Sequence, residues 1–479
     1  MPAPWFIAGL VLLSFTASCQ AADPATQQAP GVPSGLIPVE KLHADLDSLL
    51  ATMEEVHPNL YAYVSKAEAK KTFDRVRAKV DRAMTCKDFC RLIAPAVASF
   101  KNGHTFVYPM LNEFQEYIRG GGRVFPIAIQ FDRQAVILRD FYGEGTLPVG
   151  GEILTINGEK AMGVCQKYAS YFAAEGRTAN PAVIEQTKVL WALLWMDYGG
   201  DQDLELEIKS LDGKASTYTV KSVTFDKAKP RNDSASKERT SWEFRYLEDS
   251  RCGLITIQNL NGREAFEQFL QRTFRALDSK SASALIIDLR SCPGGDSRFG
   301  DALLDYLTDR PYRQMERMRI KISPQMFEKY GAQLKWNKNQ LGSFWSMDLP
   351  PNQPKKNALR FRGRVIVLIG QGSFSSSTSF AACVKHYGIA TLVGEETGDT
   401  TDLYGEGYNF RLPNSGLIIS VACKHFVLAG GSSDGRGVIP DHEVKQTRED
   451  LVAGKDTALN YAIRLLGASP TSRAKPAIR

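Results

Sequence analysis

The feature that most constrains the fold is the alternation of apolar strands and amphipathic helices in the second half of the chain. The order is strand 254–257, helix 263–277, strand 284–289, helix 299–307, strand 365–369, helix 377–385 and strand 391–393. Buried apolar strands connected by helices are typical of a sheet with helices on its faces. We therefore predict an α/β core with βαβ layers over residues 241–447.

The residues before this core divide into two further segments. Helical spacing of apolar residues predicts an N-terminal helical domain over 38–115, with a second helix that begins at Ser65. Short β-rich stretches separated by glycine turns follow over 116–225. The segment 148–158 resembles the strand and turn of a PDZ domain, and Asn157-Gly158 favours a tight hairpin. We predict a linker over 226–240 and a C-terminal helix and tail over 448–479.

Composition limits the classes of function. Hydrophobic residues make up 43% and charged residues 23% of the 479 residues, as in globular proteins. The net charge of +6 arises from 59 basic and 53 acidic residues, and the chain has no long basic run. We therefore predict no nucleic-acid partner. The sequence leaves the oligomeric state open.

The first 22 residues are typical of a secretory signal peptide. An apolar run from Trp5 to Phe15 precedes small residues that end at Ala22. The run is about half of the roughly 20 residues needed to span a membrane. We predict a flexible lead over 23–37, no membrane span, and export to the periplasm or the extracellular space. A lipid anchor on Cys19 is the less favoured alternative.

The eight cysteines do not form a recognisable metal site. Cys86 and Cys90 lie four apart on a predicted helix, and zinc sites need further Cys or His at short spacing. We predict buried free thiols, and we predict neither a metal nor an organic cofactor. The sequence does not assign any disulfide pairing.

Two strand–turn–helix junctions in the core are candidates for chemistry. In the first, a buried strand ends in Pro-Gly-Gly, where the amides of Gly294 and Gly295 can point outward and bind an oxyanion. In the second, Ser375 and Ser376 stand at the start of a helix, where free amides favour negative charge. The alternatives are an ordinary glycine turn and serines that only cap the helix.

A serine becomes a nucleophile only when a base accepts its proton. The sequence offers six histidines, and His104 stands in Lys101-Asn-Gly-His-Thr105, immediately after the third predicted helix. A histidine that follows glycine in a loop can project into a cleft. A surface or structural histidine is the alternative.

Five motifs in order resemble the tail-specific (C-terminal-processing) and tricorn serine peptidases. They are Gly103-His-Thr, the PDZ-like segment, Ile287-Asp-Leu-Arg with Pro-Gly-Gly295, Gly372-Ser-Phe-Ser-Ser-Ser377 and Gly437-Val-Ile-Pro-Asp441. The resemblance implies a crotonase-like core, Ser375 as nucleophile, and oxyanion donors at Ser376 and at Gly294 or Gly295. The lysine base of the tail-specific branch is absent, because Thr400 stands at its position. The tricorn branch implies His104 as base.

The same resemblance implies Asp434 as the acid that orients His104, with Glu395, Glu396 and Asp399 as rival candidates. The implied function is an exported serine endopeptidase that cleaves polypeptides through an acyl-enzyme. Two alternatives remain open: a catalytically inactive peptide- or ligand-binding protein on the same fold, and a small-molecule esterase. The Gly-x-Ser-x-Gly pattern of esterases is absent around Ser375.

The PDZ-like segment suggests that an extended peptide is captured by strand addition. The best candidate in this sequence for a loop that binds a terminal carboxylate is Gly120-Gly-Gly-Arg-Val-Phe125.

Overall fold

The computed structural model describes residues 35–108, 111–131, 135–177, 187–228, 241–447, 449–450 and 453–467. The chain forms two compact units, each made of separate stretches of sequence. The first unit comprises Met1–Lys237, Arg313–Pro351 and Gly398–Gly437. The second comprises Glu238–Tyr312, Asn352–Thr397 and Val438–Arg479. Two stretches of the predicted core thus belong to the first unit.

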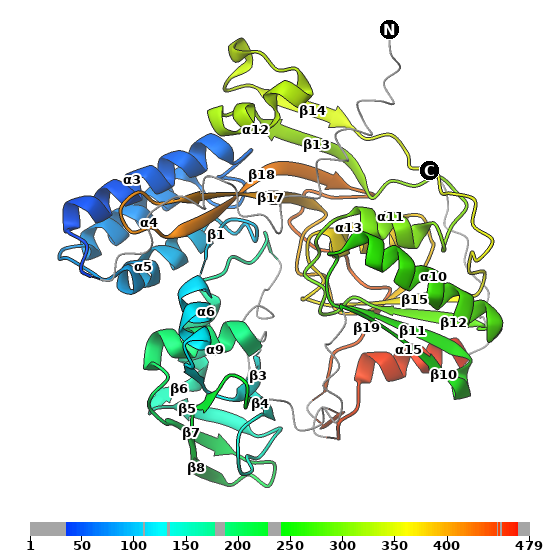
Figure 1. Ribbon diagram of the computed structural model, residues 1–479, viewed down its shortest axis with the longest axis horizontal. Helices are drawn as coiled ribbons and strands as arrows, with labels where there is room; N and C mark the ends of the chain where they lie inside the picture. The colour runs from blue at the N-terminus through cyan, green and yellow to red at the C-terminus, as the bar shows by residue number, and fades with distance from the viewer. Residues whose placement is uncertain are drawn as a thin grey trace. The chain divides into compact units, whose positions relative to one another are not determined.

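The second unit contains a six-stranded sheet (Figure 1). Its strands, in spatial order, are β10 (Trp242–Leu247), β11 (Cys252–Ile257), β12 (Ala284–Asp288), β15 (Arg364–Ile369), β16 (Thr391–Gly394) and β19 (His442–Glu443). The β10–β11 pair is antiparallel and the other pairs are parallel. The carboxyl ends of β12 and β15 therefore lie side by side, with Asp288 opposite Leu368.

Helices cover both faces of this sheet (Figure 1). Leu254, Ile286 and Leu368 pack with apolar residues of α15 (Thr457–Gly467) on one face. On the other face lie α10 (Arg263–Ser279), α11 (Arg298–Leu304) and α13 (Ser376–His386). Successive residues of a strand point to opposite faces, so an uninterrupted apolar strand packs against the helices on both faces of the sheet. The prediction of an α/β core is confirmed.

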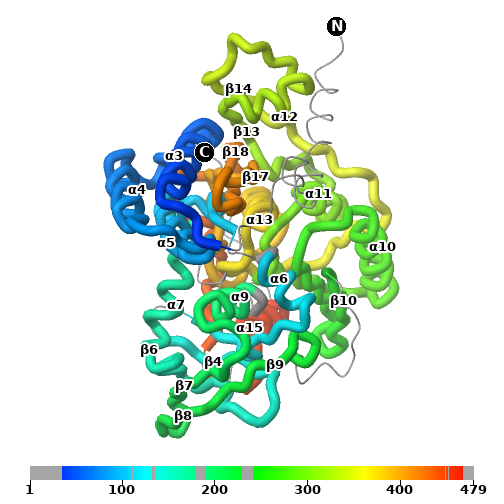
Figure 2. Tube along the Cα trace, turned by 60° about the vertical axis from the view of Figure 1, so that its left-hand side comes forward, coloured from blue at the N-terminus to red at the C-terminus, as the bar shows by residue number. Residues whose placement is uncertain are grey.

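The first unit begins with three packed helices, as predicted (Figures 1 and 2). They are α3 (Val39–Val56), α4 (Lys66–Lys79) and α5 (Cys86–Ala98). The Ser65 hydroxyl oxygen accepts a hydrogen bond from the Glu68 amide, and the Glu68 carboxylate accepts one from the Ser65 amide. This reciprocal pair explains why α4 begins there. Asp45 of α3 is fully buried and accepts hydrogen bonds from the Asn414 amide (2.9 Å) and the Ser415 amide (2.7 Å).

The three helices adjoin a sheet whose strands come from distant parts of the sequence. It runs β1 (Phe106–Val107), β18 (Ile418–Leu428), β13 (Met315–Lys321), β14 (Phe344–Asp348), and β17 (Asp402–Arg411) also pairs with β18. Helix α12 (Pro324–Leu334) and the 3₁₀ turn η3 (Lys338–Gln340) connect β13 to β14. These pairings explain why 313–351 and 398–437 belong to the first unit.

A second sheet of the first unit covers the predicted PDZ-like region. Its main path is β3 (Ile127–Phe131), β4 (Val136–Phe141), β5 (Glu152–Ile156), β7 (Leu204–Lys209) and β8 (Ala215–Val220), and β6 (Glu159–Lys160) pairs with β5. Helices α7 (Ala161–Ala169) and α9 (Thr187–Tyr198) accompany it, and β2 (Arg123–Val124) pairs with β9 (Val223–Thr224). Asn157 and Gly158 both have positive φ, as the predicted tight hairpin requires.

The glycine run at 120–122 does not form the expected carboxylate-binding loop. The amides of Gly120, Gly121 and Gly122 donate to carbonyls of α6 (Leu111–Arg119), at 2.9 Å each. They close the helix end, where carbonyls otherwise lack partners. The glycines therefore terminate a helix, and their amides are already used.

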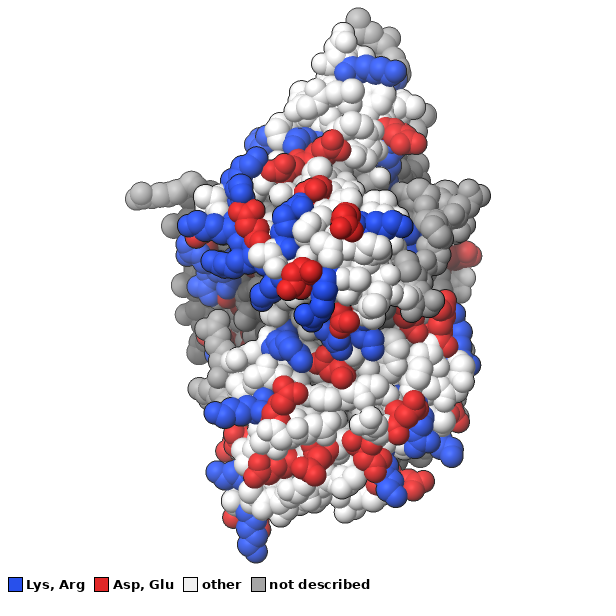
Figure 3. All heavy atoms as spheres, turned by 90° about the vertical axis from the view of Figure 1, so that its left-hand side faces the viewer, with Lys and Arg blue, Asp and Glu red and all other residues white. Residues whose placement is uncertain are grey.

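The described residues cover only part of the predicted organisation of the chain. The predicted signal peptide, residues 1–22, lies outside them, as does most of the predicted linker. None of the helices within them is long and apolar enough to cross a membrane. The seven described cysteines are buried and unpaired. On the face shown in Figure 3, acidic and basic side chains are interspersed.

Asp45→Ala is expected to destabilise the protein by about 3 kcal/mol, because it leaves the half-buried Asn414 amide and the buried Ser415 amide without an acceptor. Urea unfolding measures the change. Asp47→Ala on the same helix is the control: its side chain is 71% exposed, so a loss below about 1 kcal/mol is expected. Equal losses in both variants would contradict this role for Asp45.

Candidate active site

In the second unit, the loops after β12 and β15 are bound to each other. The Leu289 amide donates to the Leu368 carbonyl (2.9 Å), the Ser373 hydroxyl to the Leu289 carbonyl (2.8 Å), and the Phe374 amide to the Cys292 carbonyl (3.1 Å). Parallel strands bring both loops to one edge of the sheet, where α/β proteins commonly bind ligands. The two glycine- and serine-rich motifs found in the sequence are thereby adjacent.

Ser375 occupies a sharp turn between β15 and α13. Its φ of 53° and ψ of −120° lie in a region that residues other than glycine rarely adopt. Such strain costs roughly 1–3 kcal/mol and persists only where the surroundings enforce it. Ser375 stands at the N-cap of α13, yet its side chain does not cap the helix. The interpretation that Ser375 is only a helix cap is therefore wrong.

The neighbouring hydroxyls bind backbone carbonyls. Ser376 donates to the Gly295 carbonyl (2.6 Å), Thr378 to the Ser373 carbonyl (3.1 Å) and Ser379 to the Ser375 carbonyl (3.4 Å). These contacts fix the first turn of α13 around Ser375.

Gly294 and Gly295 pack directly against this turn. A Cβ on Gly294 would lie 2.6 Å from the Phe374 carbonyl oxygen and 2.9 Å from both the Ser375 Cβ and the Ser376 amide nitrogen. The φ angles of Gly294 and Gly295 are 96° and 136°. Only glycine allows this approach and this backbone. The structure thus brings the predicted oxyanion residues Gly294, Gly295 and Ser376 together around Ser375.

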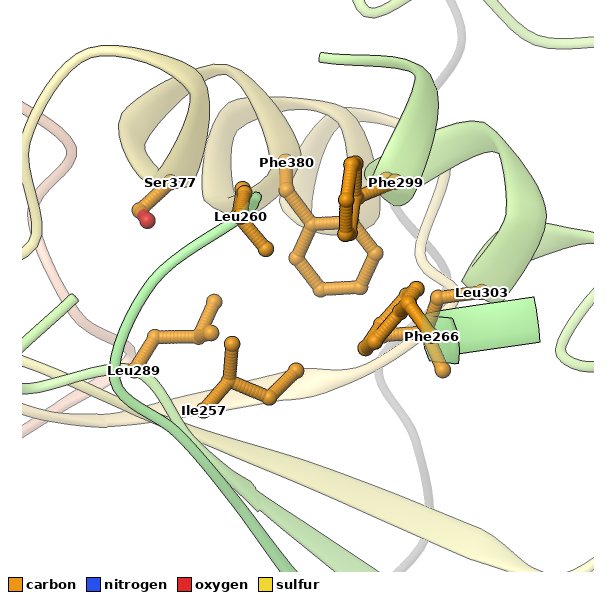
Figure 4. A pocket seen from close by; sticks show the side chains of 9 residues that line it. Ile257, Leu260, Phe266, Leu289, Phe299, Leu303, Ser377 and Phe380 are labelled. Atoms are coloured by element: carbon orange, nitrogen blue, oxygen red, sulfur yellow. The ribbon is translucent and has the colours of Figure 1, made fainter. Parts of the chain in front are cut away.

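An apolar pocket lies in the second unit between the sheet and α10, α11 and α13 (Figure 4). Phe380 and Ser377 reach it from α13, and its other lining residues are Ile257, Leu260, Phe266, Leu289, Phe299, Gly300 and Leu303. None of these nine residues is titratable, so we expect no acid–base chemistry inside it. Leu260 connects the pocket to the glycine loop, because it pairs with Gly295.

In the first unit, His104 lies in the loop after α5 with its side chain 14% exposed. Its Nδ1 is 4.0 Å from Asp399 Oδ2. Burial lowers the pKa of His104 from 6.5 to about 4, and a hydrogen bond to the Tyr404 carbonyl opposes this shift. The imidazole is therefore neutral at pH 7, as a general base must be.

Two buried carboxylates accompany this imidazole. Asp399 and Glu175 are both fully buried, and ligand atoms of His104, Glu175 and Asp399 all lie within 4.8 Å of one another. Asp399 accepts the Thr400 amide at 2.9 Å. First-row metals, with bonds of about 2 Å, hold tetrahedral ligand atoms roughly 3.3 Å apart, closer than the 4.0 Å found here. We therefore interpret the cluster as an acid–base group.

The structure does not support Asp434 as the acid that orients His104. Asp434 is exposed, and its carboxylate accepts the Arg436 amide at 3.0 Å. Asp399, one of the rival candidates, is the carboxylate beside the imidazole. The other rivals, Glu395 and Glu396, belong to the second unit. Sequence order does not fix which acid of the first unit is buried, and the motif resemblance names one that is exposed.

Sequence reasoning also missed Glu175. No motif surrounds it, and it lies in the part of the chain where the resemblance is weakest. The available signal was its position after an apolar segment, Tyr171-Phe-Ala-Ala174, where a buried acid needs partners. That signal is too general to assign a role.

The comparisons with known proteins agree with this geometry. The family model described as "Peptidase family S41" matches residues 251–444, which include Gly294, Gly295 and Ser375. The match assigns this part of the chain, residues 251–444, to peptidase family S41. This is a family of serine-type hydrolases, and the prediction of a serine peptidase of the tail-specific and tricorn kind is confirmed at the level of the family.

Solved structures show the same fold. Mature CPAF superimposes with a TM-score of 0.62 and 15% identity, over 89% of this chain and 97% of that chain. Mature CPAF complexed with lactacystin gives a TM-score of 0.61 and 16% identity, over 89% and 98%. At this identity the likeness establishes the S41 fold alone. None of the curated proteins compared with the chain matches it significantly.

Gly294→Ala is expected to cost at least about 2 kcal/mol more than Gly388→Ala, as measured by chemical unfolding. Gly388 also has positive φ, but an added Cβ would meet nothing within 4 Å. Both variants therefore strain the backbone, and only the first collides with the Ser375 turn. Similar losses would show that the turn can move away from residue 294.

Proposed function

We propose that this chain is an exported serine endopeptidase that uses Ser375 as nucleophile and His104 as general base. The observation that carries the proposal is the strained Ser375 turn beside Gly294, because it presents a hydroxyl at a helix N-terminus without using it as a cap. A strained strand-to-helix turn also presents the nucleophilic serine in α/β-hydrolases. The match of residues 251–444 to the S41 family model supports the same assignment.

The proposed reaction follows the acyl-transfer scheme. His104 takes the proton of Ser375 as the hydroxyl oxygen attacks the peptide carbonyl. The amides of Ser376 and of Gly294 or Gly295 stabilise the oxyanion. His104 then donates its proton to the leaving amine, and water hydrolyses the ester in a second cycle. Asp399 replaces Asp434 as the carboxylate that stabilises the imidazolium.

The substrate class follows from the family, whose members act on polypeptides. Peptide capture at the PDZ-like sheet would require an open strand edge. Edge strand β3 is covered, because Trp191 of α9 donates to the Ile127 carbonyl at 2.9 Å. The opposite edge, β8, is largely exposed and is the better candidate for strand addition. Export rests on residues 1–22, and a lipid anchor on Cys19 is the less favoured form.

A fluorophosphonate probe tests the nucleophile. It is expected to label wild-type protein at Ser375, and Ser375→Ala and His104→Ala are each expected to reduce labelling and peptide turnover by at least about a thousandfold. His386→Ala, at the exposed end of α13, is the control that keeps activity.

Three outcomes separate the alternatives. A wild-type protein that neither labels nor cleaves would favour the inactive binding protein. Turnover of esters without turnover of peptides would favour an esterase. Peptide turnover that survives His104→Ala would show that the base is another group.

The pH profile tests the protonation state of the base. Because His104 has its pKa lowered to about 4 and must be neutral to act, kcat/KM is expected to stay level from pH 7 down to about 5 and to fall near pH 4. An acid limb centred near the ordinary value of 6.5 would show that the imidazole is solvated during turnover.

A further inference from the structure

Glu175 holds the loop that carries His104. Its carboxylate accepts two hydrogen bonds from the Asn102 side-chain amide (3.1 and 2.9 Å) and one from the Gly103 amide. The next residue, Gly176, donates its amide to the Lys101 carbonyl at 2.9 Å. Residues 175 and 176 thus bind all three residues that precede His104.

The loop is anchored on its other side as well. The Asn102 side-chain oxygen Oδ1 accepts the Thr105 hydroxyl (2.6 Å), and the Thr105 hydroxyl oxygen in turn accepts the Ala422 amide of β18 (3.0 Å). Asn102 also donates to the Tyr404 carbonyl of β17 (3.3 Å). The His104 loop is therefore held both by Glu175 and by the β17–β18 hairpin, and Asn102 contacts both.

Two acidic groups are buried next to the same imidazole, where two negative charges would repel each other. Two fully buried carboxylates, Glu175 and Asp399, share a space with His104 in which ligand atoms lie within 4.8 Å. Burial first, and then the nearby Asp399, raise the pKa of Glu175 well above its ordinary value. Hydrogen bonds from Gly103, Asn102 and Tyr63 oppose this shift. The titratable groups that face Glu175 are Asp399, His104, Tyr63 and Tyr404.

We infer that Glu175 is a positioning residue of the active site. It holds the His104 loop as a neutral carboxylic acid, and its O–H donates a hydrogen bond to the Asp399 carboxylate. The inference rests on the proposed role of His104 as base. A single negative charge then faces the imidazole. One charge stabilises the imidazolium that forms during acyl transfer, whereas two would hold its proton too strongly.

The isosteric variant Glu175→Gln tests the protonation state. The glutamine oxygen can accept the Gly103 and Asn102 donors, and its NH₂ group can donate to Asp399 as the acid proton does. We expect kcat and KM within about threefold of wild type. Glu175→Ala removes the anchor and is expected to lower kcat about a hundredfold, with a smaller change in KM. Asp399→Asn, which removes the remaining charge, is expected to lower kcat by at least a hundredfold.

A stability measurement gives a readout that does not depend on activity. A group whose pKa is raised in the folded state stabilises fully below its unfolded pKa, about 4.5 here, and loses that contribution as pH rises through the folded pKa. Glutamine does not titrate. The free energy of unfolding of Glu175→Gln relative to wild type should therefore increase as pH rises from 5 to 9.

The experiments separate the neutral-acid role of Glu175 from the proposed peptidase function. Glu175→Gln with kcat reduced a hundredfold, or with a relative stability that is constant or falls with pH, would overturn the neutral-acid role. Activity in Glu175→Gln together with loss in Glu175→Ala would support it. If the wild type neither labels nor cleaves, the proposed function fails, and the pH dependence of stability still decides whether Glu175 carries a proton.

Discussion

The close approach of the Gly294 backbone to the Ser375–Ser376 turn is the contact on which the site depends. A side chain at 294 would collide with three atoms of that turn within 3 Å. The contact fixes the loop after β12 against the start of α13 and keeps Ser375 at its left-handed φ. Parallel pairing of β12 with β15 supplies the framework, because it places both loops at one sheet edge. Strain at Ser375 is thus maintained by packing that the rest of the second unit provides.

The first unit holds the His104 imidazole in a buried environment that also contains polar groups. Burial alone would leave His104 poorly oriented. The loop before it is fixed by Asn102, Thr105 and Glu175, through hydrogen bonds that reach β17 and β18. Asp399 supplies the neighbouring carboxylate. The orienting group is therefore a network in which one acid anchors the loop and the other faces the ring.

Much of the second unit follows from local sequence. Strand 284–289 and helix 377–385 are encoded by apolar runs and spacing, and the motifs that contain Gly294 and Ser375 form adjacent loops. In the first unit, Ser65 predicts the start of α4 through its capping box. These elements depend on residues close together in the chain, so their signals are visible without tertiary information.

The remainder depends on contacts between distant residues. In the β1–β18–β13–β14 sheet, Phe106 pairs with Ser420, and no local sequence pattern predicts that pairing. Gly120–Gly122 has the composition of a binding loop, but its amides close α6. Asp434 fits a linear motif yet is exposed, whereas Glu175 fits no motif yet is buried beside His104. Burial, which selects among acids, is a property of the folded chain.

The central claim is that the His104 imidazole acts on the Ser375 hydroxyl. A crystal structure of the protein with a fluorophosphonate bound covalently to Ser375 tests it most directly, because the adduct resembles the tetrahedral intermediate. We predict a ring nitrogen of His104 within about 3.2 Å of Ser375 Oγ, and the phosphonyl oxygen in contact with the amides of Ser376 and of Gly294 or Gly295. An adduct in which His104 lies beyond hydrogen-bond reach, with another group beside Oγ, would contradict the account.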